Sequence, residues 1–288
     1  MKDKIYNNFK KLILDIANQK YPELRKRKYS LEYYLKNFIY VLNDISKWES
    51  LKIINNNGNK TYHWKSIYNE FNKWSHDNIF EDAFNDFIKK FYFKISQIKK
   101  NKKLNMFIDV TKIYNKLGSE CITINGEYKK KNITGLTVIC DQNTLPLSVN
   151  TIDINRKLDN NRKTGVHEIK NVQKTLDKIN LSVVKDYVKI NLIGDKGYIT
   201  KNKFNILNRN INIVTPKKKN QKIRTSISDK KLLKDRYKIE HIFAKIKNNN
   251  HIMVRTEKSI INYLSFIYIS FLEIYLEYNN KQNITLHF

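Results

Sequence analysis

The sequence predicts a mixed α/β fold, an α+β arrangement with a mixed sheet, which a small all-helical region precedes. Three observations support this. Six of the seven glycines lie between Gly118 and Gly197, so the first hundred residues contain few turn signals. The spacing of apolar residues changes from a helical period to a period of two at about residue 104. Predicted strands and helices then alternate, as in folds in which helices cover a sheet.

Three helices are predicted in the first hundred residues, over 31–46, 64–74 and 79–95. In each, large apolar residues recur every three or four positions. Several short helices on a basic chain are typical of a helix-turn-helix-like DNA-binding unit. We therefore expect residues 1–100 to form a DNA-binding domain; a helical cap without DNA contacts is the alternative.

The second expected domain, residues 101–288, begins with strands. The segment "KLNMFIDVTKIY" (103–114) alternates apolar and other side chains, which predicts a strand. The segment 132–152 predicts a hairpin whose turn covers Asp141–Thr144. Further along, "YVKINLIGDKGY" (187–198) predicts an apolar strand that runs into a glycine-flanked loop.

The remaining segments complete the α/β pattern. The segment 167–179 predicts an amphipathic helix, 203–210 a short helix, and 211–216 a short strand that ends at Pro216. A basic linker follows, and it leads to a helix over about 229–248. The apolar segment 259–278 contains Asn, Ser and Glu residues that a membrane span would rarely hold, so we expect a buried or docking helix in a soluble protein.

The charge of the chain indicates an anionic partner. Lys and Arg number 55 against 27 Asp and Glu, a net charge of +28, and nucleic acid is the commonest partner of so basic a chain. An anionic membrane would require a basic amphipathic anchor or a lipidation motif, and the sequence shows neither. Two cysteines without zinc-ligand spacing indicate reduced thiols.

Three carboxylates form a candidate metal site. Asp109 lies on the first strand, on the face opposite Met106 and Ile108; Asp195 follows a later strand; Glu240 lies in the late helix. Taken singly, Glu240 is better explained as a helical ion-pair partner of Arg236 and Asp195 as a turn Asp, whereas Asp109 is as well explained as a buried strand Asp as a ligand. If the strands are neighbours and the helix crosses them, the carboxylates converge and suit two Mg²⁺ ions that promote phosphodiester displacement.

The helix that carries Glu240 has a defined charged edge. At about 100° per residue, Arg236, Glu240 and Lys247 fall within roughly 40° of one another. An apolar stripe adjoins them, so Glu240 should lie at the edge of the packed face. The side chain of Lys238 is expected to point elsewhere, to solvent or to DNA. The run of basic residues over 217–247 is either a solvated face or a surface that follows DNA.

Three blocks, "FIDVTKIYNKLGSE", "LIGDKGYI" and "RYKIEHIFAKIK", resemble the DDE transposases of insertion sequences, in the insertion-sequence-four and -five grouping. The likeness runs from about residue 104 to the C-terminal helix. The family signature of Arg, three residues, Glu, six residues and Lys is met by Arg236, Glu240 and Lys247. The Tyr that usually stands three positions before the Arg is replaced by Leu233.

The resemblance implies a ribonuclease-H-like core in which Asp109, Asp195 and Glu240 bind two Mg²⁺ ions, with Mn²⁺ as a substitute. It implies hydrolysis at transposon ends and transfer of the released 3′-hydroxyl to target DNA. The partners would be double-stranded DNA, namely the terminal inverted repeats and the target, and a homodimer on DNA, with no membrane. The residues implied or suggested to contact DNA are Arg236, Lys247, Lys196, Tyr198 and Lys238.

Two other functions fit the same residues. One is a domesticated DNA-binding protein that no longer cuts, and the other is a structure-specific nuclease without strand transfer. All three acids are present, which favours an active enzyme. The expected location is the cytoplasm, with the nucleoid, in a prokaryote, and the nucleus or a viral factory otherwise.

Overall fold

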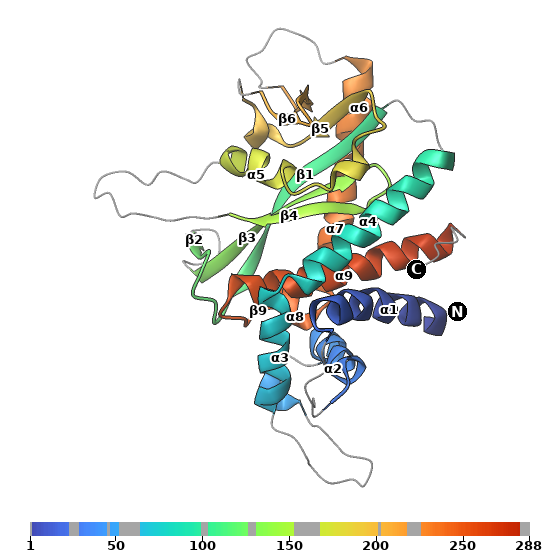
Figure 1. Cartoon of the computed structure of the whole chain (residues 1–288). Helices are drawn as coiled ribbons and strands as arrows, with labels where there is room; N and C mark the ends of the chain where they lie inside the picture. Colours follow the sequence, from blue (N-terminus) through green and yellow to red (C-terminus); the bar gives the residue numbers. More distant parts are fainter. Residues whose placement is uncertain are drawn as a thin grey trace. The chain divides into compact units, whose positions relative to one another are not determined.

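The computed structural model of the chain describes nine stretches (Figure 1), namely residues 2–22, 29–44, 47–51, 64–98, 103–125, 131–152, 168–200, 203–217 and 226–282. The chain forms two compact units. The first comprises Met1–Phe87, Asn115–Glu120 and Ile246–Phe288, and the second comprises Ile88–Tyr114 and Cys121–Lys245. These boundaries follow packing, and the expected DNA-binding role of residues 1–100 stays a prediction.

The second unit is built on a mixed sheet, which confirms the predicted α/β class. Its strands lie in the order β2-β3-β1-β5-β8, and β4 also pairs with β3. The pairs β1–β3, β2–β3 and β3–β4 are antiparallel, whereas β1–β5 and β5–β8 are parallel. The bounds are β1 Lys103–Asn115, β2 Thr123–Asn125, β3 Lys131–Asp141, β4 Pro146–Thr151, β5 Lys189–Ile193 and β8 Asn212–Val214.

Sequence and structure agree closely for these strands. In β5 the four residues from Ile190 to Ile193 are all buried, as expected for a strand between two parallel neighbours. The predicted hairpin turn is confirmed: the amide of Thr144 donates to the carbonyl of Asp141 over 3.1 Å. Thr144 has a φ of 65°, and the Asp141 carboxylate accepts hydrogen bonds from the turn.

Apart from α4 (Ile79–Ile98), whose residues from Ile88 on belong to this unit, the helices of the second unit are short. α5 packs on β3 and β4, and α6 packs against β8. The predicted helix over 229–248 is present, but a 3₁₀ turn, η6, divides it. The predicted helix over 167–179 is confirmed as a 3₁₀ turn and one short α-helix, and His167 lies outside the described residues. The bounds are η3 Glu168–Asn171, α5 Val172–Leu176, η4 Leu181–Val183, η5 Lys196–Tyr198, α6 Ile227–Lys234, η6 Asp235–Tyr237 and α7 Lys238–Lys247.

The predicted short helix over 203–210 is wrong. This segment forms a tight hairpin of β6, Asn205–Ile206, and β7, Arg209–Asn210. The two turn residues, Leu207 and Asn208, have φ values of 51° and 56°, which a right-handed helix excludes and a two-residue hairpin turn requires. Phe204 and Ile206 are both buried while Leu207 is exposed, so the apolar side chains follow a strand period.

The first unit is helical around an aromatic core. The helices expected over 31–46, 64–74 and 79–95 are confirmed as α2, α3 and α4. The helix α9 packs with α1, α3 and α8, and the ring centroids of Phe71 and Phe266 lie 4.5 Å apart. The bounds are α1 Lys2–Lys20, α2 Leu31–Asp44, η1 Trp48–Ser50, α3 Trp64–His76, α4 Ile79–Ile98, α8 Asn250–Met253, β9 Val254–Arg255 and α9 Ile260–Lys281.

The helix α9 explains the most apolar segment of the chain. Among the described residues it is the one helix with the length and hydropathy of a membrane span, but 72% of that apolar window is buried in the protein. Its faces contact other helices on several sides, as expected for a core helix. The prediction of a buried helix is therefore confirmed.

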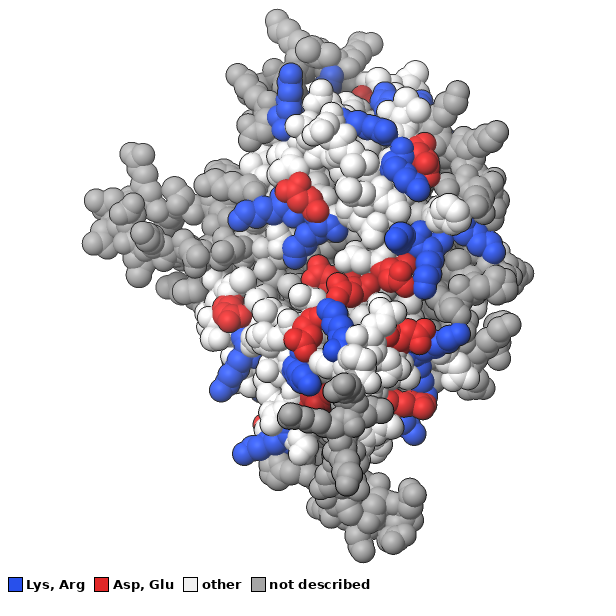
Figure 2. Space-filling model, in the orientation of Figure 1, with Lys and Arg blue, Asp and Glu red and all other residues white. Residues whose placement is uncertain are grey.

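The surface charge is mixed on the face that Figure 2 shows. Basic and acidic side chains alternate there among the described residues. The basic linker that the sequence singles out is mostly outside the described residues, since 218–225 are not described.

Candidate active site

Asp109 occupies the centre of the second unit's sheet, on β1 between β3 and β5. Its side chain is 20% exposed. The amide of Val110 donates to its Oδ1 over 2.8 Å, and Nη1 of Arg236 donates to its Oδ2 over 2.9 Å. Burial raises the pKa of Asp109, the Val110 amide and Arg236 oppose this rise, and the negative charges of Asp195 and Glu240 add to it. Two of the predicted acids therefore lie near enough to act on the third.

The register between β1 and β5 explains why Asp195 lies near Asp109. The two strands are parallel, and Phe107 pairs with Ile193. Asp109 and Asp195 each follow these partners by two residues, so the pairing brings Asp195, just beyond the end of β5, toward Asp109. Carboxyl ends of parallel strands are where α/β proteins gather their ligands. The expected convergence of these two acids follows from the pairing.

The backbone after β5 fixes the carboxylate of Asp195. Its Oδ1 accepts a hydrogen bond from the amide of Gly197 over 2.7 Å and caps η5. Gly194 lies against the ring of Tyr198: a Cβ at Gly194 would approach the ring to 2.7 Å. Tyr198 is 2% exposed, so contact with DNA would require its ring to leave this packed position. Lys196 is exposed on the same turn.

Arg236 joins the carboxylates of Asp109 and Glu240. Besides its hydrogen bond to Asp109, its Nη2 lies 3.8 Å from Oε1 of Glu240, one helical turn further on. The side chain of Glu240 is 60% exposed and that of Arg236 is 31% exposed. The ion pair that explains Glu240 as a helical partner is thus present, and the same guanidinium also reaches the strand.

Two other basic candidates differ from the expectation. The side chain of Lys238 was expected to point to solvent or DNA, but its Nζ lies 3.3 Å from Oδ2 of Asp235 and 5.8 Å from the centroid of the Phe107 ring. It is 22% exposed, because its apolar stem packs toward the sheet. Lys247 is half-buried at the end of α7, and burial lowers its pKa. Leu233 is half-buried on α6.

The described carboxylates do not form a finished metal site. Across the stretches described, no group of three or more His, Cys, Asp or Glu side chains is placed to hold a metal ion. Asp109, Asp195 and Glu240 supply the hard oxygen donors that Mg²⁺ and Mn²⁺ prefer. In this arrangement, however, the positive charge among them comes from Arg236. The three carboxylates are chemically suited to such an ion. For all three to bind it, the guanidinium of Arg236 must take another position.

The sequence did not reveal the pairing of Arg236 with Asp109, because 127 residues separate them. The sequence pattern placed Asp141 in the hairpin turn but did not predict the role of its carboxylate. Asp141 is 1% exposed and accepts hydrogen bonds from Tyr92, Asn143 and Leu145. Its position in the predicted turn was a signal for this structural role.

Comparison with known proteins gives a family match for part of the chain. Residues 155–260 match the model of a family described as "Transposase DDE domain". The match covers less than half of the chain; it includes Asp195 and Glu240 and ends short of Asp109 on its N-terminal side. Searches of curated proteins and of solved structures found no match. The family match supports a DDE transposase, with the nuclease and recombination activity and the DNA binding that the name implies.

Proposed function

We propose that the protein is a DDE transposase of the insertion-sequence-four and -five grouping with a ribonuclease-H-like core. It cuts DNA at the ends of its transposon and joins the released 3′-hydroxyl to target DNA. Asp109, Asp195 and Glu240 are the catalytic carboxylates. One observation carries the proposal. The pairing of β1 with β5 brings Asp195 toward Asp109, and Arg236 contacts the carboxylates of both Asp109 and Glu240.

The physical basis is the concentration of negative charge beside the carboxyl end of β5. The charges of Asp195 and Glu240 both act on Asp109, and burial of Asp109 makes its own charge costly. A folded protein keeps such a group where a cation or a proton is to be handled. Asp109 also pairs with Arg236, which ties the turn before α7 to β1, so its carboxylate contributes to the fold as well.

We propose that these carboxylates hold two Mg²⁺ ions, with Mn²⁺ as a substitute. When bound, the ions would activate the attacking water or hydroxyl and stabilise the leaving oxygen. The chain's own contribution is to fix the oxygen donors. The Val110 amide orients Asp109, and the Gly197 amide orients Asp195. Glu240 is exposed on α7 and is free to turn toward the ions when Arg236 moves.

The basic residues around this site would hold the DNA. Arg236 has a planar guanidinium suited to phosphate. With metal ions bound, it would release the Asp109 carboxylate and contact a phosphate of the DNA backbone instead. Lys196 is exposed beside Asp195, while Lys247 and Lys238 are the other cationic candidates. The substrates would be the terminal inverted repeats and the target duplex. A homodimer on DNA would allow two ends to be cut together.

The test is cleavage of DNA that carries the inverted repeats flanking the gene, in Mg²⁺ or Mn²⁺. The wild type should nick the repeat ends and, with target DNA, give joined products. Asp109→Asn, Asp195→Asn and Glu240→Gln should each lower the cleavage rate by about a thousandfold or more while binding of the ends persists.

The matched control is Asp186→Asn, an exposed acid of the second unit that should leave cleavage unchanged. Binding without cleavage by the wild type in both metals would overturn the proposal and leave a silent DNA-binding protein. Cleavage without joined products would instead identify a structure-specific nuclease.

A further inference from the structure

The first unit contains a cavity of about 930 Å³, bounded by η1, α3, the segment after β1 and the residues from Asn250 to Lys258. All of its lining residues belong to this one unit. A volume of this size is typical of small-molecule and cofactor sites in proteins. The cavity shares no lining residue with the proposed active site.

Three aromatic rings line the cavity. The centroid of Trp48 lies 5.3 Å from that of Tyr68, which in turn lies 6.4 Å from that of Trp64. Two flexible apolar side chains, Leu117 and Met253, line it as well, and they are 53% and 50% exposed. Rings and exposed apolar groups together offer a surface on which a flat aromatic ligand can stack.

The polar lining is mainly cationic. Lys47, Lys65, Lys116 and Lys258 are exposed around the cavity, against the two acids Glu49 and Glu257. Lys65 also lies 5.9 Å from the ring of Trp64. Of the acids, Glu257 is 2% exposed and faces the indole of Trp48, so most of the charge that a ligand would meet is positive. An anionic group is therefore favoured beside the aromatic surface.

Arg255 holds these walls in place. Its side chain is fully buried and donates hydrogen bonds to the carbonyls of Glu120, Glu257 and Lys258. Its own carbonyl accepts from the amide of Lys116 over 2.9 Å. A Cβ at Gly118 would approach the guanidinium carbon to 2.5 Å, so glycine is needed for this passage. The two segments that present Lys116 and Lys258 are thus fixed together.

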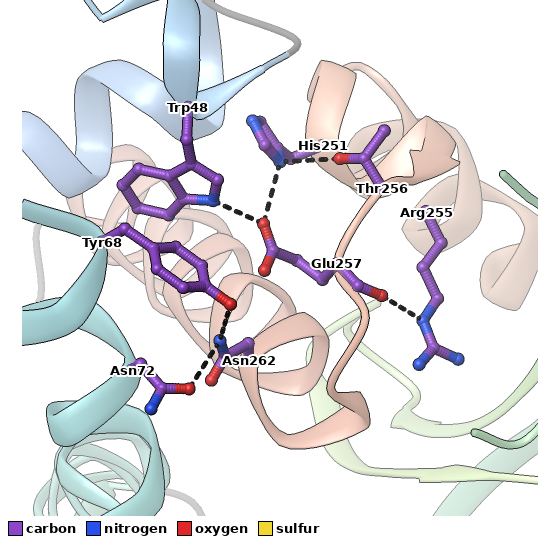
Figure 3. A network of polar contacts seen from close by, with 8 residues as sticks. All are labelled: Trp48, Tyr68, Asn72, His251, Arg255, Thr256, Glu257 and Asn262. Atoms are coloured by element: carbon purple, nitrogen blue, oxygen red, sulfur yellow. Dashed lines mark hydrogen bonds and ion pairs between the residues drawn. The ribbon is translucent and has the colours of Figure 1, made fainter. Parts of the chain in front are cut away.

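A buried polar network fixes the aromatic wall (Figure 3). Nε1 of Trp48 donates to Oε1 of Glu257 over 2.6 Å, and Nδ1 of His251 lies 3.7 Å from the same oxygen. Nδ2 of Asn262 reaches the hydroxyl of Tyr68 at 3.4 Å and Oδ1 of Asn72 at 3.0 Å. The rings of Trp48 and Tyr68 are therefore held at set positions before any ligand binds, which lowers the entropy cost of binding.

We propose that this cavity binds a nucleotide, with its base stacked on the rings of Trp64 and Tyr68 and its phosphate held by Lys116 and Lys258. A base is flat and aromatic, and its phosphate is anionic, so a single nucleotide satisfies both parts of the lining. The same chemistry is offered by an unpaired nucleotide of a nucleic-acid strand and by a free mononucleotide. The site needs no catalysis at Asp109.

Tryptophan fluorescence tests this proposal directly. The chain has three tryptophans; Trp48 and Trp64 line the cavity, whereas Trp74 is fully buried in the core. The full chain is titrated in EDTA with a short single-stranded oligodeoxynucleotide, with an abasic strand of equal length, with the matching duplex and with dTMP. EDTA prevents cutting, so failure of the proposed transposase activity does not affect the result.

The unpaired strand should quench the fluorescence, and the abasic strand should not, because only a base can stack on the rings. Tighter binding of the strand than of dTMP would identify a strand as the ligand. Equal affinity for dTMP would identify a free nucleotide. Quenching by the abasic strand or the duplex as strong as by the unpaired strand would overturn the proposal, as would no quenching at all.

Two pairs of variants locate the binding. Trp64→Leu should weaken binding of the unpaired strand, read by fluorescence anisotropy of a labelled oligonucleotide, by about tenfold or more, whereas Tyr40→Ala, an exposed aromatic outside the cavity, should change it less than about twofold. The double variant Lys116→Gln, Lys258→Gln should weaken it more than the equally charged Lys36→Gln, Lys281→Gln. If the two double lysine variants weaken binding equally, the cavity is not the binding site. The comparison of the two double lysine variants also tests the proposal if Trp64→Leu fails to fold.

Discussion

Arg236 donates a hydrogen bond from Nη1 to Oδ2 of Asp109 over 2.9 Å, across 127 residues of sequence. This pairing ties the turn before α7 to the central strand of the sheet. It also places a positive charge where the proposed metal ions would otherwise balance the carboxylates. Arg236 therefore links the fold of the second unit to its proposed chemistry.

Replacing Arg236 by lysine separates these two roles. Lysine keeps the charge but loses the planar fork that reaches Asp109 and Glu240 together. The pair is partly exposed, so Arg236→Lys should change the free energy of unfolding by less than about 1 kcal/mol in urea. Cleavage of the repeat ends should fall at least about tenfold. An unchanged cleavage rate would remove Arg236 from the proposed site.

Gly194 should be intolerant of a side chain. In Gly194→Ala the new Cβ would meet the ring of Tyr198 at 2.7 Å, which forces the backbone beside Asp195 to shift. We expect a loss of about 1–3 kcal/mol in the free energy of unfolding and a lower cleavage rate. Adding Tyr198→Ala removes the clash, so the double variant should lose less than the sum of the two single changes. Additive losses would contradict this packing.

Asp141 should matter for stability alone. Its buried carboxylate accepts from the Tyr92 hydroxyl at 3.0 Å and from the amides of Asn143 and Leu145. Asp141→Ala leaves these donors unpaired, so the free energy of unfolding should fall by about 3 kcal/mol or more. Urea unfolding measures this against Asp186→Asn, which should lie within about 0.5 kcal/mol of the wild type.

Glu273 on α9 should make stability depend on pH. Burial raises its pKa to about 7 from 4.5, the neighbouring Glu277 adds to the rise, and Asn43 and Asn249 oppose it. The folded protein thus holds a proton that the unfolded chain releases above pH 4.5. The stabilisation from this group is present below pH 4.5 and is lost as the pH rises to about 7.

Glu273→Gln removes this dependence. At pH 8 the variant should be more stable than the wild type by up to about 3 kcal/mol, and at pH 4 the two should be alike. Urea unfolding at pH 4, 6 and 8 measures the difference. A constant difference at all three values would show that Glu273 ionises in the folded protein as it does in the unfolded chain.

Local pattern was enough to predict most of the helices and strands. Helices α2, α3 and α4 and the hairpin of β3 and β4 follow from the spacing of apolar residues and from turn residues, which act within a few positions of each other. The hairpin at Leu207 and Asn208 was missed, because its turn requires positive φ at residues that carry no glycine signal.

By itself, the sequence determined the α/β class, the three candidate acids and the buried nature of α9, because periodicity and residue chemistry are local properties. Only the tertiary structure decided which groups meet. The register of β1 with β5 brings Asp195 toward Asp109, and packing brings Arg236, the helical neighbour of Glu240, to Asp109. The cavity of the first unit likewise depends on segments distant in sequence, since strand pairing and side-chain packing act through space.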